Sequence, residues 1–461
     1  MTSLWDSVAS AGSGGKGAFH GAGGSIATAE LAAASCLGET ALEALRGRSV
    51  LLALREQLST AVALLELDGV ARRLVLCTPD LTPERLAEVA AIADTDAVLV
   101  DIPPADPRAG ASVYVMQPRP AAGPIARRTT AESEWILLTS GTTGSPKLVV
   151  HTLASLAGTL PRQPPGAGSV WSTFYDIRRY GGLQIYLRAV LSGSPLVLSS
   201  PTESTAEFLA RAAARGVTHI SGTPSHWRRA LMSGAAQLLN PVYVRLSGEV
   251  ADQVVLDQLH ATYPNARIGH AFASTEAGVA FDVNDGRAGF PAEFIAGAHQ
   301  GIDMKVEDGT LRIRSQRTAA RYLGAGPNDL SGGDGYVDTG DLVELQDGRY
   351  YFRGRKGGVI NVGGLKVYPE EVECVLNADP RVRMSLVRAR HNAIMGALVV
   401  ADVVLKDSEN SMPAAAVTED IKNDLLKACR RALPAHKVPA MLRFVAALEL
   451  TAAGKLVRPG A

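Results

Sequence analysis

Short apolar segments alternate with helical segments early in the chain, and this alternation constrains the fold more than any other feature. Residues 49–54, 73–77 and 97–101 are apolar and rich in leucine and valine, as buried strands are. Helical patterns at 57–67 and 83–92 separate them, and the second follows a threonine and begins with proline, a common helix start. The sequence therefore predicts a layered α/β fold with parallel strands.

The same alternation resumes further along the chain. Residues 183–191 and 205–215 have helical patterns, and the apolar segment 195–198 between them is a predicted strand. Two more strands are predicted at 219–220 and 242–246. The α/β organisation is therefore expected to continue through a large domain.

The pattern changes after about residue 301. Short alternating strands are predicted at 304–307, 311–314 and 349–352, and Asp-Gly pairs mark turns between them. The last hundred residues or so combine strands with helices at 369–377 and about 417–433.

We therefore predict two domains with a boundary at Gly357. Residues 1–356 form a large, multi-layered N-terminal domain, which includes a small β-rich subdomain at about 301–356. Residues 357–461 form a small, mobile α+β lid domain. Residues 7–30 are rich in glycine, alanine and serine without a clear period, and we expect them to be poorly ordered or loosely packed.

Composition excludes several classes of protein. The 461 residues include 46 Lys or Arg and 46 Asp or Glu, so no overall charge favours nucleic acid or an anionic membrane. The four cysteines are dispersed, with neither metal-ligand spacing nor a disulfide framework. No signal peptide is visible, and the apolar stretch 394–405 is too short to span a bilayer. A cytoplasmic enzyme is the default expectation.

Residues 139–147 (Thr-Ser-Gly-Thr-Thr-Gly-Ser-Pro-Lys) form a candidate phosphate-binding loop between two predicted strands. Two glycines allow close approach of the backbone, and the hydroxyls and lysine add donors for a polyanion. It is not a Walker loop, because Ser145 and Pro146 separate Gly144 from the lysine and a strand follows. The alternative is an ordinary polar hairpin loop. The candidate ligand-binding residues are Thr139, Ser140, Gly141, Thr142, Thr143, Gly144 and Lys147.

Five further segments follow in a fixed order: 272–276 (Phe-Ala-Ser-Thr-Glu), 336–341 (Tyr-Val-Asp-Thr-Gly-Asp), 354–355 (Gly-Arg), 363–373 and 450–455. Together with the loop, their order and spacing resemble the adenylate-forming superfamily. That superfamily comprises acyl- and aryl-CoA synthetases, adenylation domains of nonribosomal peptide synthetases, and beetle luciferases. The resemblance extends from about Val50 to the end of the chain.

The resemblance implies activation of a carboxylic acid by ATP. The loop would hold the β- and γ-phosphates, Thr275 the α-phosphate and Glu276 a Mg²⁺ ion, which prefers carboxylate oxygen. Asp341 would accept hydrogen bonds from the ribose hydroxyls. A lone aspartate after Thr-Gly is otherwise more often a turn residue.

The adenine side of the site is implied in the same way. Phe272 takes the place of an aromatic residue that stacks on adenine, although it could be a core residue instead. Arg355 would contact the nucleotide near the hinge. By the same resemblance Ser247, Gly248 and Glu249, which follow a predicted strand, form the adenine-side loop, where close backbone approach requires a glycine. Ala273 and Ser274 belong to the segment 272–276.

Lys455 is the strongest single candidate for catalysis. Leu448, Thr451 and Gly454 match the superfamily's Leu-Pro-x-Thr-x-x-Gly-Lys ending, whereas Glu449 replaces its proline. The lysine would bridge the substrate carboxylate and the α-phosphate. The alternative is a solvated lysine on a tail.

The acid pocket is expected in the large domain. Arg179 occupies the place of a histidine in many acyl-CoA synthetases; it would pair with a second carboxylate or a polar ring substituent, or lie on the surface. The aspartate that captures an α-amino group has no convincing counterpart, so an amino-acid substrate is disfavoured. The pocket candidates are Tyr175, Arg179, Gly182, His226, Ala271 and Gly278.

Three functions remain open. The first is an acid–CoA ligase that uses ATP, Mg²⁺ and CoA, and the second transfers the same adenylate to the phosphopantetheine of an acyl carrier protein. Gly363 and Gly364 would line the pantetheine tunnel in both. The third is oxidative use of the adenylate or loss of catalysis. The oligomeric state is open, with a homodimer as one alternative.

Overall fold

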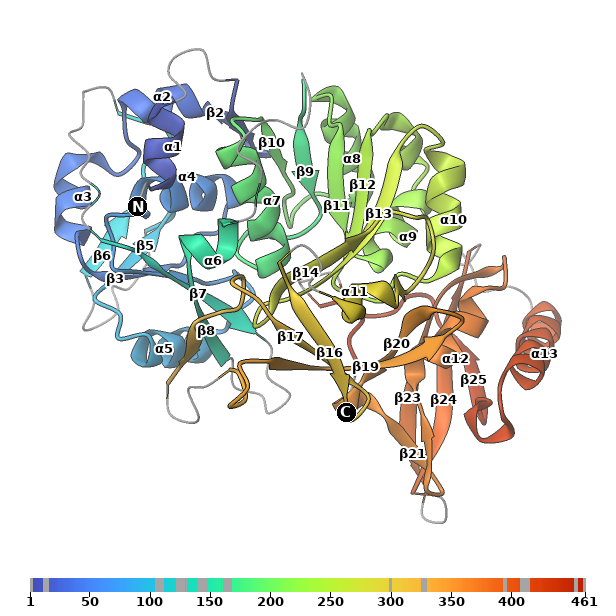
Figure 1. Cartoon of the computed structure of the whole chain (residues 1–461). Coiled ribbons are helices and arrows are strands. Elements are labelled where there is room, and N and C mark those ends of the chain that lie inside the picture. The colour runs from blue at the N-terminus through green and yellow to red at the C-terminus, as the bar shows by residue number, and fades with distance from the viewer. Residues whose placement is uncertain are drawn as a thin grey trace.

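The computed structural model arranges the chain as a large N-terminal region built on three sheets and a smaller C-terminal α+β region (Figure 1). The C-terminal region, orange to red, lies at the lower right of the large region in that view. The structure describes residues 3–10, 16–103, 112–121, 129, 131–139, 147–158, 160, 168–297, 301–324, 330–392, 396–406, 415–451 and 455–458.

A seven-stranded sheet contains the first three predicted strands, and they are parallel as expected. Helix α4 (Gln57–Leu67) packs on one face and α5 (Pro83–Ile92) on the other, at the predicted positions. Both faces are therefore buried, which explains the continuous apolar runs. In spatial order the strands are β18 (Arg321–Leu323), β8 (Lys147–Thr152), β7 (Glu134–Thr139), β4 (Arg73–Leu76), β3 (Ser49–Leu52), β5 (Ala97–Val100) and β6 (Ser112–Val115).

An eight-stranded sheet forms the other half of the large region. Helices α8 (Thr205–Ala214), α9 (Pro224–Met232) and α10 (Gln253–Thr262) pack on one face, where Val244 and Leu246 join their core. Helix α7 (Tyr180–Leu191) contacts the sheet at strand β9 (Trp171–Thr173). In spatial order the strands are β14 (Gly278–Val283), β13 (Arg267–Ser274), β12 (Tyr243–Ser247), β11 (His219–Gly222), β9 (Trp171–Thr173), β10 (Leu196–Leu198), β1 (Ala18–His20) and β2 (Ser25–Ala27).

The expectation of loose packing near the N-terminus is wrong for the residues that the structure describes. Strands β1 and β2 extend the eight-stranded sheet, and Phe19 and Ile26 are buried in its core. One buried apolar side chain per strand is sufficient to hold these strands in place, because the neighbouring strands of the sheet supply the remaining contacts. Three helices lie nearby: α1 (Leu4–Ser10), α2 (Thr28–Ala33) and α3 (Gly38–Leu45).

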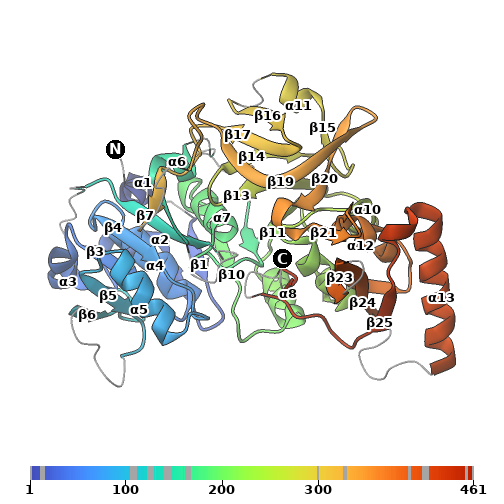
Figure 2. The same ribbon diagram turned by 90° about the horizontal axis from the view of Figure 1, so that it is seen from below.

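A five-stranded antiparallel sheet contains the predicted β-rich strands (Figure 2). The predicted Asp-Gly turns are present, with Asp308 and Asp347 at φ near +50°. Short helices α6 (Leu153–Ala157) and α11 (Glu293–Ala296) flank the sheets. In spatial order the strands are β15 (Phe290–Pro291), β20 (Arg349–Arg355), β19 (Val337–Gln346), β17 (Thr310–Arg314) and β16 (Asp303–Glu307).

The C-terminal region has a core of its own, made by two small sheets and two helices. Both helices were predicted, whereas the apolar stretch near residue 400 is an inner strand of a three-stranded sheet. No helix formed by the described residues combines the length and apolar character that a membrane crossing needs. The elements are β21 (Ile360–Val362), β22 (Leu365–Val367), α12 (Pro369–Asn377), β23 (Val382–Asn392), β24 (Gly396–Leu405), α13 (Ala415–Ala432) and β25 (Met441–Phe444).

Candidate active site

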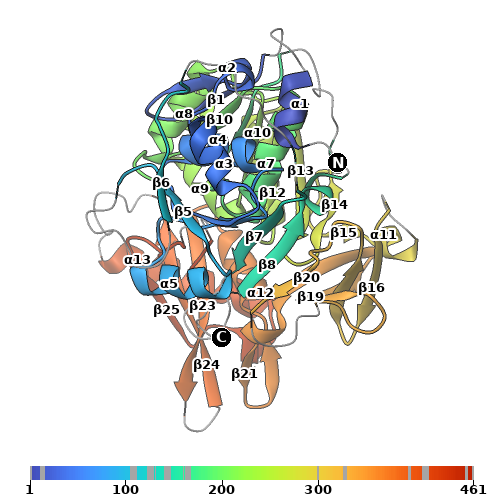
Figure 3. The same cartoon turned by 90° about the vertical axis from the view of Figure 1, so that its left-hand side faces the viewer.

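Strands β7 and β8 form the hairpin that carries the candidate phosphate loop (Figure 3). Thr139 pairs with Lys147 across its end, so the two predicted flanking strands are confirmed. Residues 140–146, which include most of the predicted phosphate-binding residues, lie outside the described part of the chain. The Lys147 ammonium lies 5.2 Å from the centre of the Tyr322 ring, on the adjacent strand β18.

Tyr322 connects this lysine to the candidate metal ligand. Its hydroxyl donates to Oε1 of Glu276 over 3.4 Å. Burial and then the neighbouring Glu276 charge raise the pKa of Tyr322 to about 12, so it stays a donor at neutral pH. The end of the phosphate loop and the predicted metal ligand are therefore brought together through a tyrosine that sequence reasoning missed.

Glu276 would hold Mg²⁺ as a single carboxylate. Among the residues that the structure describes, no group of three or more His, Cys, Asp or Glu side chains could hold a metal ion. One carboxylate fits Mg²⁺, because this ion keeps several waters and binds nucleotide phosphates alongside one or two protein oxygens. The donor set thus fits a metal that arrives with ATP.

The turn that carries Thr275 and Glu276 is fixed by hydrogen bonds. Nε2 of the buried His151 lies 2.7 Å from the Thr275 carbonyl oxygen, so this nitrogen carries the donated proton. Burial lowers the pKa of His151 to about 4, although the same hydrogen bond opposes the shift. The Ala319 N–H donates to the Glu276 carbonyl over 2.9 Å. The sequence did not indicate a role for His151, because a histidine within an apolar strand is usually a core residue.

Asp341 and Arg355 face one another across strands β19 and β20. Nε of Arg355 donates to Oδ1 of Asp341 over 3.2 Å, and Nη2 donates to the Thr339 carbonyl over 3.2 Å. Burial raises the pKa of Asp341, while the Arg355 charge opposes this shift. The arginine side chain is 65% exposed and the aspartate 18%, so the pair opens towards solvent on the arginine side.

The C-terminal tail brings Lys455 to the same place. Its charge and that of Asp341 influence each other's pKa, and its side chain lies against Gly248. Lys455 is exposed as a residue, yet protein around its ammonium lowers its pKa by desolvation, an effect that Glu249 opposes. The lysine therefore joins the predicted nucleotide residues of the large domain.

Hydrogen bonds to the carboxylates of Glu249 and Glu373 hold the tail. The Glu249 carboxylate accepts from the Ser225 N–H at the start of α9 and from the Leu456 N–H of the tail, over 3.0 and 3.2 Å. Arg458 donates to both oxygens of the buried Glu373 on α12 over 2.9 and 2.8 Å. These two anchors lie at Leu456 and Arg458, directly after Lys455 in the chain.

Phe272 stacks on Phe352 with ring centres 5.0 Å apart. It also packs against the core of the β-rich sheet, which is the alternative that the sequence left open. Its contact with adenine stays a prediction. Ser274 accepts the Ala277 N–H over 3.0 Å and thereby supports the Thr275–Glu276 turn.

Tyr175 and His226 meet beside strand β12. Their rings are 5.9 Å apart, and the Tyr175 hydroxyl donates to the Ser247 carbonyl over 2.6 Å. Burial lowers the pKa of His226 to about 3. Ser247 also pairs in register with Ala271. The pocket candidates Tyr175, His226 and Ala271 therefore lie together next to Gly248.

The other pocket candidates differ in their contacts. Arg179 forms an ion pair with Asp80 over 3.1 Å. A Cβ on Gly182 would lie 2.2 Å from the Asp176 carbonyl oxygen, and one on Gly278 would lie 2.5 Å from that of Arg317. Gly363 and Gly364 form the turn between β21 and β22 in the C-terminal region, both with positive φ.

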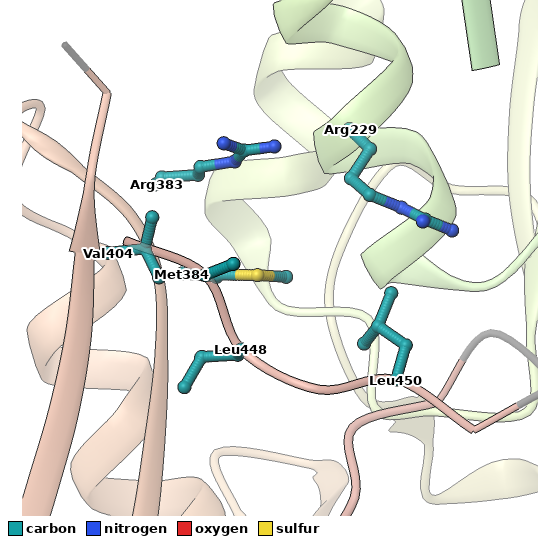
Figure 4. Close-up of a pocket in the computed structure, with 7 residues that line it drawn as sticks. Arg229, Arg383, Met384, Val404, Leu448 and Leu450 are labelled. Atoms are coloured by element: carbon teal, nitrogen blue, oxygen red, sulfur yellow. The ribbon is translucent and has the colours of Figure 1, made fainter. Parts of the chain in front are cut away.

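A cavity of about 350 Å³ lies between α9 and the C-terminal region (Figure 4). None of the site residues predicted from the sequence lines it. Arg229 and Arg383 both line it, and burial and then the Arg383 charge lower the pKa of Arg229. The cavity therefore belongs to the domain interface. Its lining residues are Arg229, Arg383, Met384, Val404, Ala447, Leu448 and Leu450.

Known proteins resemble this chain in sequence. Residues 28–319 match the AMP-binding enzyme family, and residues 371–455 match the AMP-binding enzyme C-terminal domain. A 2-succinylbenzoate–CoA ligase of Salmonella typhimurium is 30% identical over 54% of this chain and 53% of the ligase. The 4-hydroxybutyrate–CoA ligase 1 of Metallosphaera sedula is 25% identical over 69% of this chain and 60% of the ligase. The aligned part thus spans little more than half of these ligases.

Solved structures share the fold. The o-succinylbenzoate CoA synthetase of Bacillus subtilis, in complex with an acyl-adenylate, matches with a TM-score of 0.78 and 20% identity, over 99% of this chain and 98% of that one. ATP-bound MatB of Rhodopseudomonas palustris matches with a TM-score of 0.79 and 21% identity, over 98% and 96%. The predicted α/β fold with a smaller C-terminal domain is confirmed. Since the family match covers well over half of the sequence, this chain belongs to the AMP-binding enzyme family, as its motifs predicted.

Proposed function

We propose that the protein activates a carboxylic acid with ATP and then transfers the acyl group to CoA. The observation that carries this proposal is the position of Lys455, which the tail brings to Gly248 and beside the Asp341–Arg355 pair. A cation delivered by a separate domain to a nucleotide site suits a reaction in which negative charge develops between two substrates.

In the first step, a carboxylate oxygen attacks the α-phosphorus and the bond to pyrophosphate breaks. Lys455 would stabilise the oxygens of the carboxylate and α-phosphate, and Thr275 would donate to the α-phosphate. Asp341 would hold the ribose, and the Arg355 charge opposes the rise in the pKa of Asp341 that burial causes. Mg²⁺, when bound at Glu276, would neutralise charge on the triphosphate.

In the second step, the CoA sulfur attacks the acyl carbon, the bond to AMP breaks and the thiol proton is released. We propose that residues 357–461 rotate about Gly357 between the steps, because glycine tolerates the backbone changes that a hinge needs. Rotation would withdraw Lys455 and bring the Gly363–Gly364 turn towards the acyl group.

Transfer to a carrier protein is the second candidate. It is favoured by an isonitrile lipopeptide synthase of Streptomyces coeruleorubidus that is 28% identical over 76% of this chain. The deciding experiment measures pyrophosphate, AMP and thioester from ATP, Mg²⁺ and a panel of acids, with CoA or with holo carrier protein. Formation of ADP and phosphate would contradict both candidates, and thioester only on the carrier would favour the second.

A further inference from the structure

The face of the eight-stranded sheet that lies opposite helices α8–α10 carries an unusual set of polar side chains. Along β12, Val244 and Leu246 join the core of α8–α10, so Tyr243 and Arg245 point to the other face. In register on β11, His219 and Ser221 share this face. All four side chains are buried, which sets this face apart from an ordinary apolar core.

Three arginines converge there. Nε of Arg245 donates to Oδ1 of Asp282 over 2.7 Å, and Nη1 of Arg317 donates to the Val279 carbonyl over 2.9 Å. Arg188 extends from α7, and burial, followed by the Arg245 charge, lowers its pKa. Asp282 is the carboxylate that influences all three arginines. Three guanidinium groups thus share one carboxylate, which leaves an excess of positive charge.

Several donors in this cluster lack an acceptor. Among the described residues, Nε of Arg188 and Nη2 of Arg245 are buried without a hydrogen-bond partner, and so are Nε1 of Trp171 and Oγ of Ser221. The Arg245 side chain is only 5% exposed. Buried guanidinium N–H groups without acceptors are costly, and one carboxylate does not satisfy three cations, so such a cluster is expected to receive an anionic group from a ligand.

The cluster lies next to the proposed reaction centre. Ser247 follows Arg245 by two residues on the same face of β12, an advance of about 6.6 Å. Gly248, the next residue, touches Lys455. An acid that has its reacting carboxylate at Lys455 and extends back along β12 would reach the arginines with its far end.

We propose that Arg188, Arg245 and Arg317 bind a second carboxylate, so that the substrate is a dicarboxylic acid; this inference rests on the proposed function. It gives these arginines the role that sequence reasoning offered to Arg179, whose guanidinium pairs with Asp80 instead. Sequence patterns do not reveal this cluster, because the three arginines lie in different elements.

The test compares matched acids that differ only in the second carboxylate: butyrate with succinate, hexanoate with adipate, octanoate with suberate, and benzoate with phthalate. Pyrophosphate release is measured for wild type, Arg188→Met, Arg188→Lys and Arg215→Met. The last is the control, since Arg215 is exposed at the C-terminal end of α8, on the opposite side of the sheet from the cluster. We expect wild type to prefer one diacid over its partner in kcat/KM. Arg188→Met should lower that ratio about a hundredfold, Arg188→Lys should restore part of it, and the control should keep it.

Thermal shifts with the diacids, without ATP, separate this inference from the proposed function. If the diacids stabilise wild type but not Arg188→Met, and no pyrophosphate is released, the carboxylate site is supported and the proposed activity is refuted. If pyrophosphate is released but the monoacids are used as well as the diacids or better, the carboxylate site is refuted and the proposed activity is supported. Neither stabilisation nor release would refute both. A ratio unchanged in a folded Arg188→Met variant would also overturn the inference.

Discussion

The side chain of Lys455 lies against the backbone of Gly248, where an added Cβ would be 3.3 Å from the lysine Cε. The two residues are about two hundred positions apart and belong to different regions of the fold. Gly248 has φ of +85°, a conformation that other residues rarely adopt. The glycine therefore provides both the turn after β12 and the space for the lysine.

Substituting Lys455→Ala should separate the two half-reactions. Loss of the cation at the developing charge is expected to slow adenylate formation by about a hundredfold or more. Conversion of a supplied acyl-adenylate and CoA to thioester should stay near the wild-type rate, because the lysine has then left the site. Equal loss in both half-reactions, measured by stopped assays, would contradict the two-pose mechanism.

Gly248→Ala should impair adenylation beyond the effect of backbone strain. The positive φ costs about 1–3 kcal/mol for a non-glycine residue, and the methyl group crowds the lysine. Gly193→Ala is the matched control, because Gly193 has φ of +63° and open space around its Cβ position. Both variants should lose thermal stability, but only Gly248→Ala should slow adenylation about tenfold or more. Similar rates in the two variants would show that the contact is unimportant.

Glu276→Gln should weaken the use of Mg²⁺–ATP. The amide keeps an acceptor for Tyr322 but removes the ionised oxygen, so adenylation should fall by roughly two orders of magnitude. Titration with Mg²⁺ should show partial recovery at high concentration, with little change in melting temperature. Activity within a few-fold of wild type at low Mg²⁺ would refute the metal assignment.

Arg458→Met should act on Lys455 through the tail. Loss of the two hydrogen bonds to Glu373 leaves a buried carboxylate without its cation, and the tail loses one of its two anchors. We expect slower adenylation with thioester formation from supplied adenylate largely retained. An equal loss in both half-reactions would point to damage of the C-terminal region as a whole.

Three buried histidines should make the protein less stable as the pH falls below about 6.5. Burial lowers the pKa of His151 and His219 to about 4 and that of His226 to about 3, whereas an unfolded histidine has a pKa near 6.5. On these three histidines the unfolded chain therefore binds more protons between pH 6.5 and 4, whereas burial raises the pKa of Asp68 to about 6 and opposes part of this effect. The free energy of unfolding should fall as the pH is lowered, by up to about 1.4 kcal/mol per pH unit for each such histidine.

Chemical denaturation at several pH values checks this slope. His219→Gln should reduce the pH dependence of the free energy of unfolding by about one proton, because glutamine does not titrate. His219 is chosen because it lies away from the predicted nucleotide residues. An equal slope in wild type and His219→Gln between pH 6.5 and 4.5 would contradict the prediction.

The sequence alone determined the parallel α/β strands, the β-rich strands with their Asp-Gly turns, and the family. These depend on patterns within a few residues: apolar runs bounded by helix starts, paired turn residues, and short motifs such as 272–276. The sequence also predicted correctly that strands flank the candidate phosphate loop, since Thr139 ends one strand and Lys147 begins the next.

Only the tertiary structure decided which distant side chains meet. The ordered N-terminal strands β1 and β2, the contacts of Tyr322 and His151 with the Thr275–Glu276 turn, and the position of Lys455 all depend on strand register and domain packing. The arginine cluster is the clearest case, because Arg188, Arg245 and Arg317 have no common spacing. Arginines that show no pattern along the chain form a specific site when folding buries them together and leaves some of their N–H groups without acceptors.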